Sequence, residues 1–275
     1  MIYDTISIQA EGSLDYARLQ IYILDSTPGY QEGLLRPMIL VCPGGGYEHT
    51  SDREAEPVAM RLLAMGYHVG ILRYSTAPAK YPTALLELAQ AMKTVHENAQ
   101  KWHVNIKKIF VQGFSAGAHL AASLGVSWNQ ELVYKSTGIP AKKLRPAGMI
   151  LCYPVVTSEK GLAHEGSFQN LLGEVERKEW EKISIEKQVG IHCPPCFIWH
   201  TCTDETVPVE NALLLFSALK KAGVSVELHI YPEGKHGLSL GDASTSDPEG
   251  NMICESVQSW ISLLKIWLAS QTEEK

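Results

Sequence analysis

The chain has 275 residues, of which 45% are hydrophobic, as expected of a globular protein with a substantial core. The formal net charge is −6 and no run of like charges is present, which argues against a nucleic-acid partner. The N-terminal residues lack the pattern of a signal peptide, and no apolar run approaches the length of a membrane span. We therefore expect a soluble, cytoplasmic protein that does not associate with a membrane.

Taken in chain order, the first elements are two strands, 5–10 and 17–24, which form the antiparallel edge of a sheet. The continuous apolar run at 37–42 is typical of a strand covered on both faces, and it ends in three successive glycines. A helix is predicted over 54–65, and a strand over 67–74 follows it.

A long helix is predicted over 82–102, and an apolar strand from residue 108 leads into a turn at 113–117 and a small-residue helix. The remaining predicted elements are strands at 148–156, 196–201 and 224–231 and helices at 208–222 and 251–270. This alternation of strands and helices is typical of a parallel sheet. Because the chain has no internal repeat or linker, we expect a single domain over residues 1–275.

Residues 157–195 form a polar, charged segment between two predicted strands, with short helical pieces at 167–172 and 177–183. A connection of this length is usually more than a link. We interpret it as a cap-like insertion over the mouth of a site, with an ordinary surface helix pair as the alternative.

The six cysteines lie mostly in or beside apolar runs, where free thiols pack as small hydrophobic side chains. Cys193 and Cys196 have the spacing of a redox or zinc pair, but no second cysteine pair accompanies them. We interpret their segment as a structural loop. We expect neither a metal ion nor a cofactor.

The turn at 113–117 reads Gly-Phe-Ser-Ala-Gly, which is the Gly-x-Ser-x-Gly pattern of a nucleophile elbow between a strand and a helix. Such a turn strains its central residue and brings neighbouring chain so close that side chains at positions 113 and 117 would clash. Chance occurrence of the short pattern is the alternative, and the flanking strand and helix argue against it. Ser115 is therefore the candidate nucleophile.

A serine nucleophile needs a base within hydrogen-bond reach, and the base needs an acidic partner. Ligand chemistry in such sheets gathers at the carboxyl ends of the strands, so the candidates are His, Asp and Glu residues just beyond predicted strands. Asp204 and His236 meet this condition and follow Ser115 in the expected chain order.

Other residues compete for these two roles. The competing histidines are His49, His119, His200 and His229. His119 lies on the helix that follows Ser115, and two of the others lie within predicted strands, where a structural role is the default. A helix cap is the alternative role for Asp204, and Glu205 is the weaker candidate for the acid.

Attack on an acyl carbon places negative charge on the carbonyl oxygen, which backbone N–H groups stabilise by roughly 3 kcal/mol each. Gly45 and Gly46 follow a predicted buried strand, and Ala116 follows the candidate nucleophile. We expect these three residues to donate the hydrogen bonds of an oxyanion hole, with a simple tight turn as the alternative for the glycines.

Four segments together resemble the α/β-hydrolase esterases related to acetyl and acetylxylan esterases and to feruloyl-esterase-like proteins, often called lipase/esterase or sugar hydrolase. They are Pro43-Gly44-Gly45-Gly46-Tyr47, Gly113-Phe114-Ser115-Ala116-Gly117, the segment from His200 to Pro208, and Lys235-His236-Gly237. The resemblance covers nearly the whole chain. It implies an α/β-hydrolase fold with a mostly parallel eight-stranded sheet and helices on both faces.

The resemblance also implies Ser115 as nucleophile, His236 as base and Asp204 as its partner. Pro43 departs from the His-Gly-Gly-Gly motif of the hormone-sensitive-lipase branch, so the substrates of that branch do not transfer to this chain. Tyr47 is a candidate for a substrate contact.

We therefore hypothesise a metal-independent serine carboxylesterase that acts on a small acyl ester, with an acetyl group on a sugar or short oligosaccharide as the favoured substrate. The alternatives are a peptidase of the prolyl-oligopeptidase type and a non-catalytic protein of the same fold that binds a ligand. The sequence leaves the oligomeric state open, with a homodimer among the alternatives.

Overall fold

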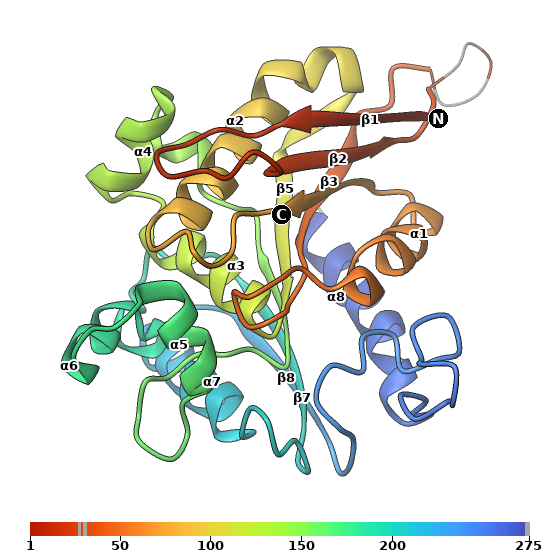
Figure 1. The fold of residues 1–275 in the computed structure, drawn as a ribbon. Coiled ribbons are helices and arrows are strands. Elements are labelled where there is room, and N and C mark those ends of the chain that lie inside the picture. The colour runs from red at the N-terminus through yellow and green to blue at the C-terminus, as the bar shows by residue number, and fades with distance from the viewer. Residues whose placement is uncertain (27–28, 30–31, 273–275) are drawn as a thin grey trace.

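The computed structural model describes residues 1–26, 29 and 32–272. All strands of these residues form one sheet in the order β1-β2-β4-β3-β5-β6-β7-β8 (Figure 1). The strands are β1 (Ile2–Ser7), β2 (Arg18–Ile23), β3 (Arg36–Cys42), β4 (His68–Arg73), β5 (Val104–Phe114), β6 (Met149–Cys152), β7 (Cys196–Thr201) and β8 (Val226–Tyr231). β1 pairs with β2 and β2 with β4 in antiparallel fashion, and all other pairs are parallel. The predicted mostly parallel sheet with an antiparallel edge is confirmed.

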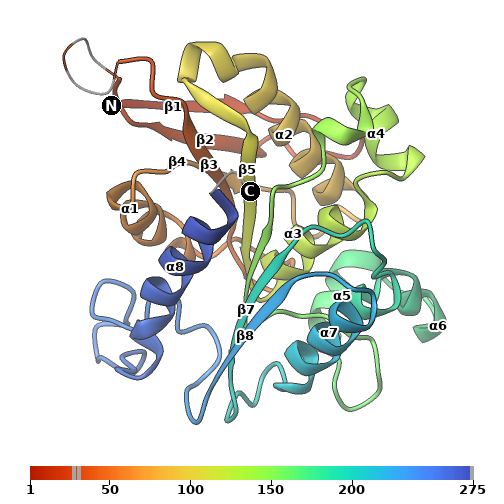
Figure 2. The same cartoon turned by 180° about the vertical axis from the view of Figure 1, so that it is seen from behind.

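Helices cover both faces of this sheet. They are α1 (Glu56–Ala64), α2 (Thr83–Trp102), α3 (Ala116–Ser127), α4 (Glu131–Thr137), α5 (Glu165–Leu172), α6 (Arg177–Trp180), α7 (Glu210–Lys221) and α8 (Trp260–Thr272). α1 and α8 lie on one face and α2, α3 and α7 on the other (Figures 1 and 2). Neighbouring side chains of a strand point to opposite faces, so Ile39 and Val41 pack in the core with α1 and α8, whereas Met38 and Leu40 pack in the other core.

Several boundaries differ from the prediction, and hydrogen bonds or strand pairing explain two of them. The last helix begins at Trp260 rather than at 251, because the Cys254 N–H donates to the Gly241 carbonyl, 2.9 Å away, and this segment therefore pairs with a distant loop. Ser256 is followed by a short 3₁₀ turn, Val257–Ser259, that leads into the helix. The first strand begins at Ile2 instead of residue 5, because Ile2 pairs in register with Ile23 of β2. The short helix α4 was not predicted.

Five adjacent parallel strands, β3, β5, β6, β7 and β8, end at the same edge of the sheet. The residues that follow them therefore meet there, although they are far apart in the sequence. Among the described residues, no helix is long and apolar enough to cross a membrane.

Candidate active site

Ser115 lies in the tight turn between β5 and α3. Its φ of 52° and ψ of −119° are strained for a residue with a side chain. A Cβ atom at Gly113 would lie 2.1 Å from the Gly117 carbonyl oxygen, and one at Gly117 would lie 2.1 Å from the Cys42 carbonyl oxygen. Only glycine fits at these two positions, so the turn has the geometry of a nucleophile elbow.

The ring of His236 lies between Ser115 and Asp204. Its Nε2 is 2.7 Å from Ser115 Oγ, and its Nδ1 is 2.6 Å from Asp204 Oδ2. A carboxylate can only accept a hydrogen bond, so Nδ1 carries the proton and Nε2 is left to accept the Ser115 O–H. The structure thus brings together the three residues that the sequence predicted, in the tautomer that removes a proton from the serine.

Asp204 follows β7, and three hydrogen bonds fix its carboxylate. Its Oδ1 accepts the backbone N–H groups of Thr206 and Val207, both at 2.9 Å, while Oδ2 faces His236 and also His200, whose Nε2 is 3.3 Å away. Burial raises the pKa of Asp204, but the hydrogen bonds from the two histidines outweigh it and hold the pKa below its ordinary value. Asp204 is therefore ionised and caps the following turn at the same time.

The glycine loop after β3 lies against the elbow. A Cβ atom at Gly44 would lie 2.7 Å from the Phe114 carbonyl oxygen and 3.0 Å from Ser115 Cβ. Gly45 and Gly46 have φ values of 125° and 63°, which favour glycine. Within the part of the chain that the structure describes, the N–H groups of Gly45, Gly46 and Ala116 have no hydrogen-bond acceptor. These N–H groups are available to an anionic oxygen beside Ser115, and their role as an oxyanion hole stays a prediction.

The structure gives no support to Tyr47 as a substrate contact. Its side chain is 2% exposed, and its hydroxyl is 2.9 Å from Nδ1 of the buried His119. His119 Nε2 lies 2.9 Å from the Ile183 carbonyl oxygen, which can only accept, so Nε2 donates and Nδ1 accepts the Tyr47 O–H. Burial lowers the pKa of His119 to about 4. Both side chains are buried structural groups.

Among the described residues, none of the other competing side chains forms a hydrogen bond with Ser115. His229 bonds to Glu227 within its own strand, and His49 and Glu205 are exposed. His200 is fully buried next to Asp204 and donates to the Val207 carbonyl oxygen at 2.9 Å.

The segment over 157–195 reaches the glycine loop through α5. Asn170 Nδ2 donates to the Gly46 carbonyl oxygen at 2.9 Å. His164 precedes α5, and its Nδ1 accepts from Ser167 Oγ at 2.8 Å and from the Ser167 N–H, which places the ring proton on Nε2. His164 Nε2 has no partner among the described residues, and the ring lies close to Gly46.

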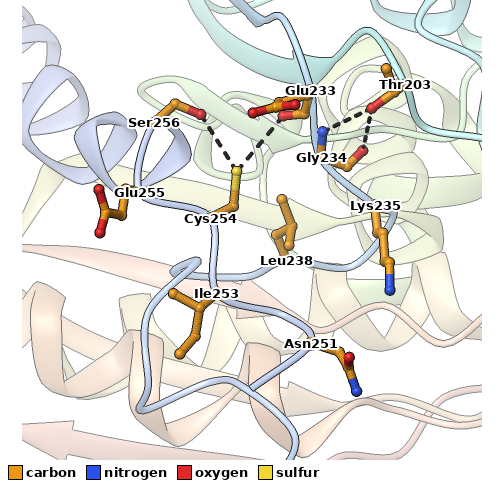
Figure 3. Close-up of a pocket in the computed structure, with 10 residues that line it drawn as sticks. All are labelled: Thr203, Glu233, Gly234, Lys235, Leu238, Asn251, Ile253, Cys254, Glu255 and Ser256. Carbon is orange, nitrogen blue, oxygen red and sulfur yellow. Dashed lines mark hydrogen bonds between the residues drawn. The ribbon is translucent and has the colours of Figure 1, made fainter. Parts of the chain in front are cut away.

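A cavity of about 550 Å³ opens beside His236. Its lining residues are Thr203, Glu205, Thr206, Lys235, His236 and Met252. A second cavity of about 470 Å³ lies on the loop that carries His236, between that loop and residues 251–256 (Figure 3). His236 lines the first cavity but not the second, so we take the first as the one adjoining the candidate active site. The described residues contain no group of three or more His, Cys, Asp or Glu side chains that could hold a metal ion.

Sequence reasoning missed three side chains that contact this site: Arg53, Glu54 and Tyr153. Tyr153 directly follows β6, so it lies at a strand end like Asp204. The prediction extended that strand to residue 156 and considered only histidines and acids, and Tyr153 was lost for both reasons. Nothing in the sequence marks Arg53 or Glu54, because their partners are groups that lie elsewhere in the sequence.

Comparison with known proteins places this chain in a family. A family model described as BD-FAE matches residues 24–219. The chain belongs to the BD-FAE family. Among solved structures, the BD-FAE chain is similar to the acetyl ester-xyloside bifunctional hydrolase from Caldicellulosiruptor lactoaceticus, with 38% identity, a TM-score of 0.78, and coverage of 92% of this chain and 88% of that one. It is also similar to the carboxylesterase Cest-2923 from Lactobacillus plantarum WCFS1, with 28% identity, a TM-score of 0.84 and 98% coverage of both chains.

Curated relatives of this BD-FAE protein include an acetylxylan esterase of Xylanibacter ruminicola, 30% identical over 209 residues that make up 74% of this chain and 41% of that protein. Endo-1,4-beta-xylanase B of Butyrivibrio fibrisolvens is 34% identical over 218 residues, or 78% of this chain and 34% of that protein. The chain thus spans less than half the length of these two relatives. The resemblance to acetylxylan-esterase-like α/β-hydrolases is confirmed.

Proposed function

We propose that this protein is a serine carboxylesterase that hydrolyses small acyl esters, with acetyl groups on sugars or short oligosaccharides as the substrate class. The observation that carries the proposal is the hydrogen-bonded series from Ser115 through His236 to Asp204. The unpaired N–H groups beside Ser115 support it, as do the names of the relatives, which include an acetylxylan esterase and carboxylesterases.

In the proposed reaction, Ser115 Oγ attacks the acyl carbon while His236 Nε2 takes the hydroxyl proton. The carbonyl oxygen becomes negative and accepts hydrogen bonds from the N–H groups of Gly45, Gly46 and Ala116. When the ester bond breaks, His236 returns its proton to the departing alcohol oxygen and an acyl group stays on Ser115. A water molecule, deprotonated by His236, then releases the carboxylic acid and restores the serine.

The alcohol part of the ester leaves beside His236 Nε2, because that atom protonates it. The cavity next to His236 carries hydroxyl and charged side chains from Thr203, Thr206, Glu205 and Lys235. Such groups exchange hydrogen bonds with the hydroxyls of a sugar, which favours a carbohydrate alcohol. The free Nε2–H of His164, whose ring lies close to Gly46, is a candidate donor to the substrate.

A panel of substrates tests this proposal. We expect hydrolysis of p-nitrophenyl acetate and of acetylated xylose and cellobiose, with rates that fall as the acyl chain lengthens, and no release of p-nitroaniline from a proline-linked peptide substrate. Cleavage of the peptide in preference to the esters would favour the peptidase alternative. Absence of turnover on every substrate, together with failure of a fluorophosphonate to label Ser115, would favour a non-catalytic binding protein.

A cytoplasmic location is part of the same proposal. All six cysteines are free thiols, and four of them are buried. Free thiols in this number are typical of proteins that work in a reducing compartment.

A further inference from the structure

Glu54 is a buried carboxylate for which the reaction above has no use. It ends the 3₁₀ turn Asp52–Glu54 and is 4% exposed. Its Oε2 accepts the Gly44 N–H at 2.7 Å, and its Oε1 accepts the Tyr153 O–H at 2.7 Å. One side chain thus bonds both to the glycine loop beside Ser115 and to the residue after β6.

Tyr153 extends this connection to the loop that carries His236. Its hydroxyl accepts the Ser239 N–H at 3.0 Å, and its ring packs edge-on against the His236 ring, with centroids 5.1 Å apart. Burial raises the pKa of Tyr153 and the nearby Glu54 carboxylate raises it further, so the hydroxyl keeps its proton for Glu54.

Arg53 makes a second connection from the same turn. Its guanidinium donates to the carbonyl oxygens of Gly237 and Thr245, both at 2.6 Å, and its own carbonyl oxygen accepts from Ser239 Oγ at 2.8 Å. Gly237 directly follows His236, so Arg53 fixes the loop by hydrogen bonds immediately after the histidine. Before the histidine, the loop is held from another side by Thr203, which bonds to both the N–H and the carbonyl of Gly234 (Figure 3).

We propose that Arg53, Glu54 and Tyr153 are positioning residues that lock the glycine loop and the His236 loop into one rigid unit. The proposal rests on the proposed function, since it concerns the alignment of its two halves. Two of the three proposed oxyanion donors, Gly45 and Gly46, are on the glycine loop, and the proposed base is on the His236 loop. Both loops must converge on one carbonyl group. A shift of about 1 Å between such groups can lower a rate by about 100-fold.

Two conservative variants test the positioning unit, and each changes one partner of the hydrogen bond between Tyr153 and Glu54. Tyr153→Phe keeps the ring against His236 but removes the hydroxyl. Glu54→Gln keeps the shape, yet it places an NH₂ group, which can only donate, against one of the two donors that Glu54 now accepts. We expect each variant to lower kcat on p-nitrophenyl acetate by about 10- to 100-fold, with KM changed by less than about threefold, because the alignment of the groups and not the binding of the substrate is lost.

The double variant gives a readout that a merely structural role would not move. Because either change breaks the same link, Tyr153→Phe with Glu54→Gln should be no slower than the worse single variant by more than about twofold. The matched controls are Tyr231→Phe, which removes a hydroxyl bonded to Ser259 at 2.9 Å, and Glu87→Gln, which changes a fully buried carboxylate bonded to Ser75 and Ser13. Both controls should keep the wild-type kcat.

The rate at which a fluorophosphonate labels Ser115 is measured beside kcat, so that the two proposals fail separately. Labelling of the wild type without ester turnover would overturn the proposed function, whereas the loss of labelling rate in the two variants would still support the positioning unit. The positioning proposal would be overturned if Tyr153→Phe and Glu54→Gln had the same kcat and labelling rate as their control variants. It would also be overturned if the two effects multiplied in the double variant. If Glu54→Gln does not fold, Arg53→Lys makes the same test, since lysine lacks the planar fork that reaches both Gly237 and Thr245.

Discussion

The residues around Ser115 and the segment over 157–195 are held in place by different means. Ser115, Asp204 and His236 each follow a strand of the sheet, and Ser115 and Asp204 are each only 6% exposed. The 157–195 segment instead consists of turns, short helices and 3₁₀ turns that do not join the sheet.

The segment is anchored by aromatic side chains and not by its many charges. Its ion pairs, such as Arg177 with Glu165 and Lys182 with Glu179, involve exposed side chains and contribute about 0–1 kcal/mol each. Inside, the rings of Phe168 and Trp180 stack with centroids 5.2 Å apart, and Phe168 also packs against His119 of α3.

From this difference we expect the strand ends to determine the reaction rate on all substrates and the 157–195 segment to determine the preference among substrates. The sheet determines where the three candidate catalytic side chains meet, so changes there should affect every substrate alike. The 157–195 segment touches the glycine loop through Asn170 and approaches it through His164, so changes there should affect some substrates more than others.

The largest effect is expected from Gly113→Ala, which changes the turn that carries Ser115 at the end of β5. The new Cβ would meet the backbone oxygen of Gly117 at 2.1 Å, and backbone cannot move aside as a flexible side chain can. We expect the free energy of unfolding to fall by more than about 4 kcal/mol, or the protein not to fold. Chemical denaturation measures this.

Gly138→Ala is the control, since Gly138 also has a positive φ, of 70°, but nothing lies within 4 Å of its added Cβ. It should cost only about 1–2 kcal/mol of conformational strain. Equal losses in the two variants would show that the elbow is not sterically closed.

Asp204→Asn should give the next largest effect. The Asn oxygen can still accept the N–H groups of Thr206 and Val207, but its NH₂ group would then face His236 Nδ1 and favour the wrong tautomer. We expect kcat to fall by about 10³- to 10⁴-fold on all esters with little change in stability. Steady-state kinetics on two esters of different alcohols check this, and a loss confined to one ester would contradict it.

His119 joins the two regions and should make stability depend on pH. Its pKa is about 4 in the folded protein and 6.5 without burial, so between these values the unfolded chain binds a proton that the folded chain does not. The free energy of unfolding should therefore fall as the pH is lowered from 6.5 to 4, by up to about 1.4 kcal/mol per pH unit from this residue.

Urea denaturation of wild type and His119→Gln between pH 7 and pH 4.5 measures that dependence. The variant should be less stable at pH 7, where the bonds to Tyr47 and Ile183 are lost, but should lose less stability on acidification. Parallel pH profiles for the two proteins would refute a neutral, buried His119.

The smallest effect is expected from His164→Asn. Asn is a favoured helix cap and can accept the Ser167 N–H as His164 Nδ1 does, but it lacks the ring Nε2–H. We expect kcat/KM for acetylated xylose to fall by about five- to tenfold, the worth of one hydrogen bond, with a smaller change for p-nitrophenyl acetate. Equal changes for both esters would instead indicate a general disturbance of the site.

Sequence patterns predicted the fold because the strands are continuous apolar runs that end in sharp turns. Those ends also identified Ser115, Asp204 and His236, since each side chain follows a strand by a few residues. For residues that directly follow a strand, the sequence pattern of the strand therefore also predicts where the side chain lies in the fold.

The same reasoning did not predict the burial of Tyr47 or the hydrogen bonds of Glu54. The direction of the Tyr47 side chain depends on the buried partner His119, 72 residues later in the chain. Glu54 accepts from Gly44 and Tyr153, and neither bond has any local signature in the sequence. Contacts with groups that are distant in the sequence become visible only after folding.

The most direct test of the central claim is to trap the acyl group. The protein is mixed with p-nitrophenyl acetate, quenched in acid during the first turnover and digested, and its peptides are weighed by mass spectrometry. We predict a burst of p-nitrophenol in wild type with an acetyl group on the peptide that contains Ser115, and neither signal in Ser115→Ala. Unchanged turnover in Ser115→Ala, or an acetyl group on another residue in place of Ser115, would contradict the account.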